Sequence, residues 1–164
     1  MKDLTLVKMS VADLLKTHVN IQEELRRRDV LRTANNPTGD LAEYLFCEAF
    51  NWIQAINSQS GYDAIDNENT RYQIKGRRVH YRNKSRQMSA LRNLASRPFD
   101  VLAGVLFDDT YKISRAALVP FEIVLEQAAY SKHTNSHIFH LRDSVWEVDG
   151  VVDVTKPLHK VLSV

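Results

Sequence analysis

The longest uncharged apolar run of this chain, Val101 to Phe107, lies within a strand pattern that extends from Phe99 to Phe107. A strand that is apolar on both faces belongs at the covered centre of a sheet. The run is far too short to cross a membrane, which takes about 20 residues. We therefore expect a layered domain over residues 1–164, with an N-terminal helical extension (1–36) and a core (37–164).

Two helices are expected before the sheet. Ser10 suits the N-cap of the first helix, and the second is expected over Asp40–Ile53. The second helix is apolar on almost every side, as a buried helix is, so its charged residue Glu43 requires a partner. That partner is either an ion pair with Lys75 or an arginine, or a metal site.

The remaining patterns predict a mixed α/β fold. Strands and helices alternate along the chain, and the first two strands form a hairpin, which together favour a mixed sheet flanked by helices. The expected strands are Tyr62–Asp66, Arg71–Arg78, Phe99–Phe107, Tyr111–Val119, His137–Leu141 and Val145–Val148, and the expected helices are a short one over Gln87–Ala95 and one from Phe121 to about Tyr130.

Basic residues are concentrated between Arg71 and Arg97. These 27 residues hold nine Lys or Arg and no Asp or Glu, whereas the whole chain has a formal charge of only +2, so the rest of the chain sums to −7. Such a block is a candidate surface for an anionic ligand, most commonly nucleic acid, and a solvated basic face is the alternative. The candidate nucleic-acid contacts are Arg77, Arg78, Arg82, Lys84 and Arg86.

Residues with catalytic potential gather in the expected hairpin. Strand alternation places Gln73 and Lys75 on one face, and hairpin pairing brings Asp63 beside them. Asp63 can hold a hard divalent cation, which polarises a phosphate and lowers the pKa of a bound water. Lys75 can stabilise the charge that develops in the transition state or help to position the water. The three residues together favour phosphodiester cleavage.

These residues give the chain a resemblance to the PD-(D/E)XK nuclease superfamily, the restriction-endonuclease-like proteins, in the variant with Gln in the last motif. Asp63 matches the first acid, Gln73-Ile74-Lys75 the final triplet, and Glu43 the acid on the preceding helix. The resemblance implies an α-β-β-β-α-β core over roughly Thr38–Leu141. The chain also resembles an uncharacterised bacterial family that shares the pattern ELRRR…NNPTGDLAEYLF…GYDAID…YQIKGRR.

The resemblance implies a metal-dependent endonuclease that hydrolyses phosphodiester bonds of DNA, with RNA as an open alternative substrate. The implied cofactor is Mg²⁺ or Mn²⁺, held by Asp63, Gln73, the carbonyl of Ile74 and Glu43. Cleavage of both strands would require a homodimer or two binding events, with the first helix as the candidate pairing element. Because an amide ligates metal more weakly than a carboxylate, the alternative is a catalytically inactive nucleic-acid-binding module that retains the nuclease fold.

Other classes of chemistry are disfavoured. The chain has no Gly-rich phosphate loop, so no nucleotide cofactor is expected. Its only cysteine, Cys47, has apolar neighbours and is expected in the core, and one cysteine excludes an internal disulfide. The first ten residues, MKDLTLVKMS, lack the apolar segment of an export signal, so we expect a cytoplasmic protein without membrane contact.

Overall fold

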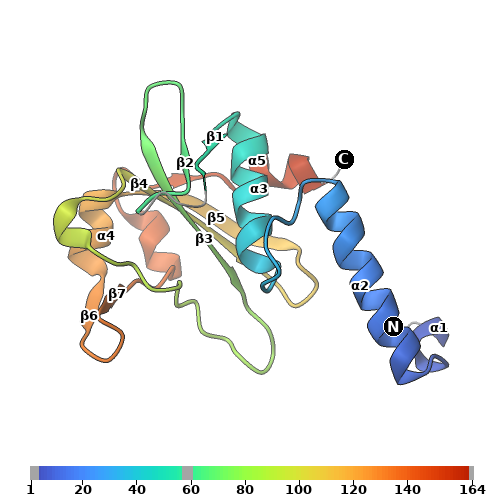
Figure 1. Ribbon diagram of the computed structural model, residues 1–164. Helices are drawn as coiled ribbons and strands as arrows, with labels where there is room; N and C mark the ends of the chain where they lie inside the picture. Colours follow the sequence, from blue (N-terminus) through green and yellow to red (C-terminus); the bar gives the residue numbers. More distant parts are fainter. Residues whose placement is uncertain (1–3, 57–60, 163–164) are drawn as a thin grey trace.

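The computed structural model describes residues 4–56 and 61–162 and shows a mixed α/β fold (Figure 1). Six strands form one sheet in the order β1-β2-β3-β4-β5-β8, in which β3 and β4 are parallel and all other neighbours are antiparallel. The expected α/β class with a mixed sheet is therefore confirmed. The strands are β1 (Ile53–Gln54), β2 (Ala64–Ile65), β3 (Arg71–Arg78), β4 (Val101–Phe107), β5 (Ile113–Pro120) and β8 (Val152–Asp153).

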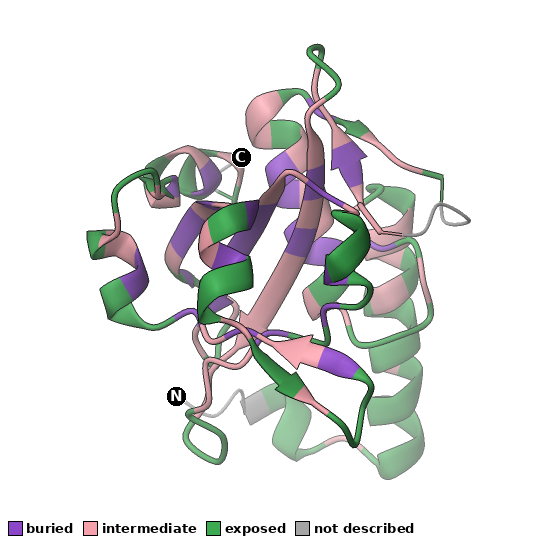
Figure 2. Ribbon diagram, turned by 90° about the vertical axis from the view of Figure 1, so that its left-hand side faces the viewer, coloured by how far each residue is buried: buried purple, intermediate pink, exposed green. Residues whose placement is uncertain are grey.

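Strand β4 is the centre of the molecule, as its apolar run predicts. Every residue from Leu102 to Phe107 is buried, and β4 pairs along its length with β3 on one side and β5 on the other. Ala103 and Val105 pack on one face of the sheet with α3 (Thr38–Phe50) and α5 (Thr155–Leu162). Leu102 and Leu106 pack on the other face with α4 (Phe121–Gln127). Figure 2 shows buried residues along the strands of the sheet.

Helix α3 lies unusually close to β3 because a glycine faces it. A Cβ atom built on Gly76 would lie 2.7 Å from the carbonyl oxygen of Thr38 and 3.0 Å from the Cβ of Ala42. Phe46 on the same helix is fully buried, and Trp52 just after it stacks on Tyr72 of β3 with ring centroids 3.6 Å apart. This packing fixes the position from which Glu43 approaches the sheet.

A buried carboxylate ties the segment before α3 to that helix. Asp40 Oδ2 accepts hydrogen bonds from Arg32 N (2.9 Å), Thr33 N (2.7 Å) and Thr33 Oγ1 (3.0 Å). Because Asp40→Ala leaves these donors without their acceptor, we expect the free energy of unfolding to fall by about 1–2 kcal/mol, measured by chemical denaturation. Asp149→Ala, at an exposed position, serves as the control, and equal effects of the two changes would contradict the assigned role.

The structure corrects two expected elements between and after the main strands. The segment Gln87–Ala95 is irregular, with isolated β-bridges at Gln87 and Leu91 and a 3-10 turn, η1 (Leu94–Ser96), in place of the expected helix. Its backbone bonds are made to a distant segment, because Met88 N donates to Phe139 O (2.9 Å). The expected strand Val145–Val148 was also wrong, since this stretch lies in and just after a 3-10 helix, η2 (Asp143–Glu147).

Other elements are shorter than expected or were not predicted. Helix α4 ends at Gln127, and the expected strand over His137–Leu141 contributes only its first residues to a separate hairpin. That hairpin consists of β6 (Ala129–Ser131) and β7 (Ser136–Ile138). The sequence patterns did not predict β1, β8 or α5.

The N-terminal helices extend away from the sheet (Figure 1). A short helix, α1 (Leu4–Val7), precedes α2 (Val11–Arg27). The expected cap is confirmed, because Ser10 Oγ accepts a hydrogen bond from Asp13 N (3.1 Å). None of the residues of α2 is buried.

Candidate active site at the edge of strand β3

The backbone of β3 holds Asp63 in place. Asp63 N donates to Tyr72 O (2.7 Å), and Asp63 Oδ2 accepts a hydrogen bond from Ile74 N (2.7 Å). Strand β2 begins only at Ala64, one residue after Asp63. A longer β2 would offer a backbone carbonyl to Ile74 N–H, and here the carboxylate of Asp63 accepts that hydrogen bond instead. The carboxylate is therefore fixed by the sheet itself.

Gln73 and Lys75 converge on the same carboxylate oxygen. Gln73 Nε2 donates a hydrogen bond to Asp63 Oδ2, and Lys75 Nζ lies 3.9 Å from that oxygen. The side chains of Lys75 and Asp63 are only 19% and 24% exposed, so water screens their attraction less than it would at an open surface. The expected juxtaposition of the three residues is confirmed, while their chemical roles stay predictions.

Glu43 approaches the same region from α3 and has two partners of its own. Its Oε2 accepts a hydrogen bond from Gln54 Nε2 (2.6 Å) and lies 3.5 Å from Arg32 Nη1. Burial raises the pKa of Glu43, and the negative charge of Asp63 raises it further, so the two carboxylates lie within electrostatic reach of each other. Glu43 thus pairs with an arginine, one of the expected alternatives, and the charge of Asp63 also acts on it.

No sequence pattern identifies Arg32 or Gln54 as part of this region. Arg32 lies between α2 and α3, and Gln54 lies in the two-residue strand β1, where no periodic pattern marks them. A buried glutamate does predict that some partner exists. Which residue serves as that partner depends on the tertiary fold.

The oxygen atoms gathered here suit a hard divalent cation. Asp63 and Glu43 offer carboxylates, and a bound cation would relieve their mutual repulsion. The amide of Gln73 presents its nitrogen to Asp63, and rotation of that amide would present its oxygen instead. Within residues 4–56 and 61–162 no group of three or more His, Cys, Asp or Glu is arranged to hold a metal, so the donor set rests on two carboxylates, one amide and the carbonyl of Ile74.

A polar hollow of about 550 Å³ opens beside Gln73. Arg92 lines it together with Ser89, Asn93 and Ser96, all from the loop that precedes β4. Arg92 is exposed and makes no ion pair with any described residue, so its guanidinium is available to an anion. Arg92 belongs to the basic block but was not among the expected nucleic-acid contacts, because charge alone does not show which residues line a hollow.

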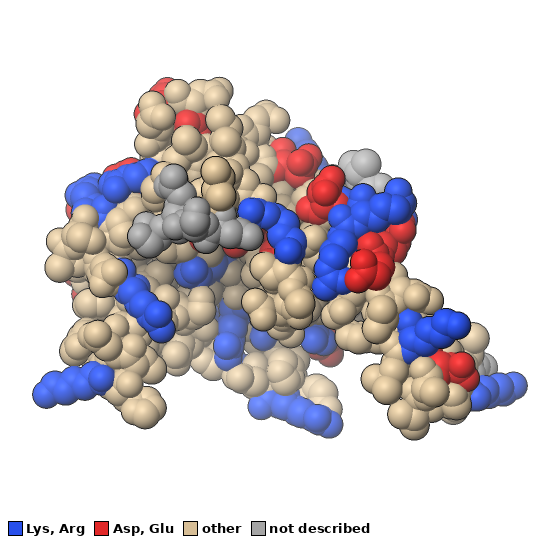
Figure 3. All heavy atoms as spheres, in the orientation of Figure 1, with Lys and Arg blue, Asp and Glu red and all other residues tan. Residues whose placement is uncertain are grey.

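The structure divides the basic block. Acidic residues from elsewhere in the chain neutralise part of it: Arg71 and Arg97 bind Asp100 (2.9 and 3.6 Å), and Arg86 binds Asp143 (2.7 Å). On the face shown in Figure 3, Lys and Arg form several separate groups, not one continuous patch. Arg86, an expected nucleic-acid contact, is therefore less available than its place in the sequence indicates.

Other expected contacts cluster at the far end of β3. Arg77 and Arg78 line a second polar hollow, of about 300 Å³, with Thr38 and His80. No Asp or Glu is among the described residues that line it. Both guanidiniums are positioned by backbone carbonyls, because Arg77 Nε donates to Ser85 O (3.0 Å) and Arg78 Nη2 donates to Asp109 O (2.5 Å). The remaining expected contacts, Arg82 and Lys84, are exposed on the following loop.

Asp66, close in sequence to Asp63, has a role in the fold. Asp66 stabilises the turn between β2 and β3, since its side chain accepts hydrogen bonds from Glu68 N and Thr70 N (both 2.9 Å) and from the hydroxyl of Tyr72 (2.8 Å).

Burial raises the pKa of Cys47 to about 12, so its thiol is protonated at neutral pH and is a poor nucleophile.

Comparison with known proteins assigns no family to this chain. No family model matches its sequence, and no curated protein matches it. Among the described residues, no helix combines the length and the apolar character needed to cross a membrane.

Proposed function

We propose that this chain is a metal-dependent endonuclease that hydrolyses phosphodiester bonds of DNA. One observation carries the proposal: Gln73, Ile74 and Lys75 converge on a single oxygen of Asp63 at the edge of β3. Glu43, on α3, lies within electrostatic reach of Asp63. Two carboxylates and an ammonium group, all at least half buried, favour a reaction on a phosphate over simple surface binding.

Each residue has a role that its position allows. Asp63 and Glu43, with the oxygens of Gln73 and Ile74, would hold Mg²⁺ or Mn²⁺, which polarises the phosphate and lowers the pKa of a water. Lys75 places a fixed positive charge beside the phosphate, where negative charge grows in the transition state. Its ion pair with Asp63, at 3.9 Å, keeps the ammonium group beside the carboxylate before the substrate binds.

The order of elements supports the proposed relation to restriction-endonuclease-like proteins in part. A helix bearing the glutamate (α3), a hairpin bearing the aspartate and the lysine (β2–β3), a third strand (β4) and a later helix (α4) follow one another as that core requires. Strand β5 lies between β4 and α4 and interrupts the expected α-β-β-β-α-β order. Of the described strands that follow α4, β6 and β7 form a separate sheet, and the two-residue β8 joins the main sheet beside β5.

If Arg92, beside the hollow at Gln73, contacts a DNA phosphate, its removal changes how DNA binding depends on salt. Each phosphate contact contributes about 0.9 to the slope of log K against log salt concentration on duplex DNA. Arg92→Ala is expected to weaken binding and to reduce this slope by about 0.9, as measured by fluorescence anisotropy at several salt concentrations. Arg86→Ala is the matched control, because its guanidinium already pairs with Asp143. An unchanged slope for Arg92→Ala would show that Arg92 makes no contact with a DNA phosphate.

A catalytically inactive DNA-binding module is the second candidate. The observation that favours it is the hydrogen bond from the Gln73 amide to Asp63, which occupies a position where a carboxylate would bind metal more strongly. Such a module would bind DNA through the same arginines and would not cut it.

The experiment that separates the two candidates is incubation of supercoiled plasmid with the purified chain in Mg²⁺, in Mn²⁺ and in a chelator. The proposal predicts nicked or linear plasmid with metal and intact plasmid with the chelator. Intact plasmid in every condition, together with salt-sensitive DNA binding, would support the inactive module. A parallel incubation with single-stranded and duplex RNA identifies the substrate class.

A further inference from the structure

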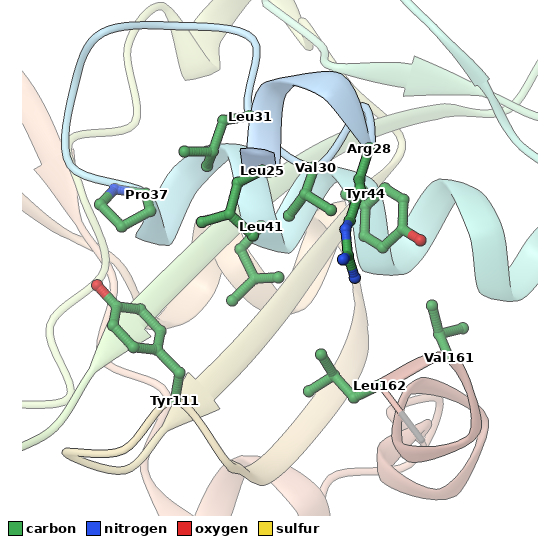
Figure 4. A pocket seen from close by; sticks show the side chains of 10 residues that line it. All are labelled: Leu25, Arg28, Val30, Leu31, Pro37, Leu41, Tyr44, Tyr111, Val161 and Leu162. Carbon is green, nitrogen blue, oxygen red and sulfur yellow. The ribbon is translucent and has the colours of Figure 1, made fainter. Parts of the chain in front are cut away.

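Two hollows away from Asp63 differ in the chemistry of their walls. The hollow of about 390 Å³ between α2, α3 and α5 is walled mainly by apolar side chains, among them Leu41 and Leu162 (Figure 4). The hollow of about 300 Å³ at the end of β3 is lined by Arg77 and Arg78, which are both half-buried. Because water screens half-buried charges less than exposed ones, this second hollow suits an anion.

Contacts within the fold hold Arg78 against this second hollow. Its Nη2 donates to Asp109 O (2.5 Å), and its guanidinium carbon lies 4.7 Å from the centre of the Tyr111 ring. Its Nε is buried but has no hydrogen-bond partner among the residues that the structure describes. A buried N–H without an acceptor costs free energy, and an oxygen of a bound anion would supply the missing acceptor.

The other polar side chains of this hollow already use acceptor atoms within the protein. The side-chain oxygen of Asn36 accepts a hydrogen bond from Thr38 N, and that of Asn83 accepts one from Ser85 N (both 3.1 Å). His80 Nδ1 accepts the backbone N–H two residues further along the chain (3.3 Å). The amide nitrogens and the second ring nitrogen are left as donors. The hollow therefore favours a ligand that only accepts hydrogen bonds.

We propose that this hollow binds the terminal phosphate of a DNA strand. A phosphate monoester carries a charge of about −1.5 to −2 at neutral pH and three acceptor oxygens, whereas an internal phosphate of DNA carries one charge. The two guanidiniums match the charge of the monoester, and guanidinium groups bind phosphate oxygens in pairs. The inference rests on the proposed DNA substrate, and it does not require that the chain cuts DNA.

The hollow lies close enough to the candidate active site for one DNA strand to contact both. Arg78 follows Lys75 by three residues of β3, which corresponds to about 10 Å along the strand. This distance equals the axial rise of about three nucleotides in duplex DNA. A terminal phosphate in the hollow thus adds affinity for strand ends while a nearby part of the same strand lies at the site.

Fluorescence anisotropy in a chelator tests the proposal without cleavage. Three internally labelled duplexes of one sequence carry a phosphate at both 5′ ends, at both 3′ ends or at neither. One phosphorylated duplex should bind at least about 10-fold more tightly than the hydroxyl-ended duplex, which is the size of effect expected for one hydrogen bond to a charged group. Equal affinity for all three duplexes, or binding to none of them, would overturn the proposal.

Two variants test whether the preference comes from this hollow. Arg78→Met should remove it. Asn83→Asp should also remove it, because the new carboxylate repels the phosphate and can still accept the hydrogen bond from Ser85 N. Arg142→Met, at an exposed position outside the hollow, should keep the preference.

The outcomes separate this site from the proposed nuclease activity. A preference for phosphorylated ends in a chain that leaves plasmid intact with metal would support the end site and contradict only the nuclease. A preference that survives both Arg78→Met and Asn83→Asp would overturn the proposal. An equal loss of affinity for all three duplexes in Arg78→Met would overturn it as well, because it would show contact with an internal phosphate.

Discussion

Replacing Asp63 with Asn should lower the rate of DNA cleavage by at least about 100-fold, the size of effect that follows loss of support around a catalytic metal. The substituted amide oxygen can still accept the hydrogen bond from Ile74 N, so the edge of β3 should keep its structure. What is lost is the negative charge that a divalent cation requires. The rate of plasmid nicking under excess enzyme measures the effect.

Lys75→Met provides the second arm of this prediction. Methionine retains much of the lysine side chain's bulk but removes its charge, so we expect a loss of about 10²–10³-fold in the same assay. Lys156→Met, at an exposed position of α5, is the matched control and should cut at the wild-type rate. Full activity in both the Asp63 and the Lys75 variants would rule out this site as the source of cleavage.

Gly76→Ala is expected to lower the free energy of unfolding by about 2–3 kcal/mol, because inserted atoms in a packed interior force the backbone to shift. The added methyl group would lie 2.7 Å from the backbone oxygen of Thr38 and 3.0 Å from Ala42. A backbone atom cannot rotate away as a side chain can, so α3 must move off β3. Chemical denaturation monitored by fluorescence of the tryptophans measures the change.

The control for this prediction is the same substitution at Gly39. A Cβ atom there would meet nothing within 4 Å, and Gly39 lies within α3. Alanine favours helix over glycine by up to about 1 kcal/mol, so Gly39→Ala should leave the stability unchanged or raise it. Equal destabilisation by both changes would contradict the close approach of α3 to β3. Because α3 carries Glu43, its movement in the Gly76→Ala variant should also lower the rate of DNA cleavage.

The strongest sequence patterns predicted the central elements correctly. The apolar run through Val101–Phe107 became the buried central strand, and the alternation in Arg71–Arg78 became its neighbour β3. Ser10 caps α2, and Pro120 comes directly before α4. In each case a long periodic pattern or a terminal residue with a specific conformational preference specifies the element locally.

Elements that depend on distant contacts were missed. The apolar residues Met88, Leu91 and Leu94 recur every three positions, which resembles a helix. In the fold they bury their side chains against the sheet, while Leu91 N donates to His137 O (3.0 Å). Strands β1 and β8 are two residues long and carry no period to detect. Hydrogen bonds to distant parts of the chain determine the conformation of these segments.

The candidate site likewise combines contacts that the sequence predicts with contacts that depend on the tertiary fold. Hairpin geometry alone predicted that Asp63 would lie beside Gln73 and Lys75, because a strand register relates them directly. The partners of Glu43 and the hollow lined by Arg92 could not be predicted, since they depend on how α3 and the loop before β4 pack on the sheet. The ion pairs that neutralise Arg71, Arg86 and Arg97 were hidden for the same reason.

The most direct test of the central claim is a crystal of this chain soaked in Mn²⁺ and measured at a wavelength where manganese scatters anomalously. The proposal predicts an anomalous peak bound by the carboxylates of Asp63 and Glu43, with the Gln73 amide rotated to present its oxygen. Absence of a peak at the edge of β3, with the hydrogen bond from Gln73 to Asp63 intact at saturating Mn²⁺, would contradict the metal-dependent mechanism.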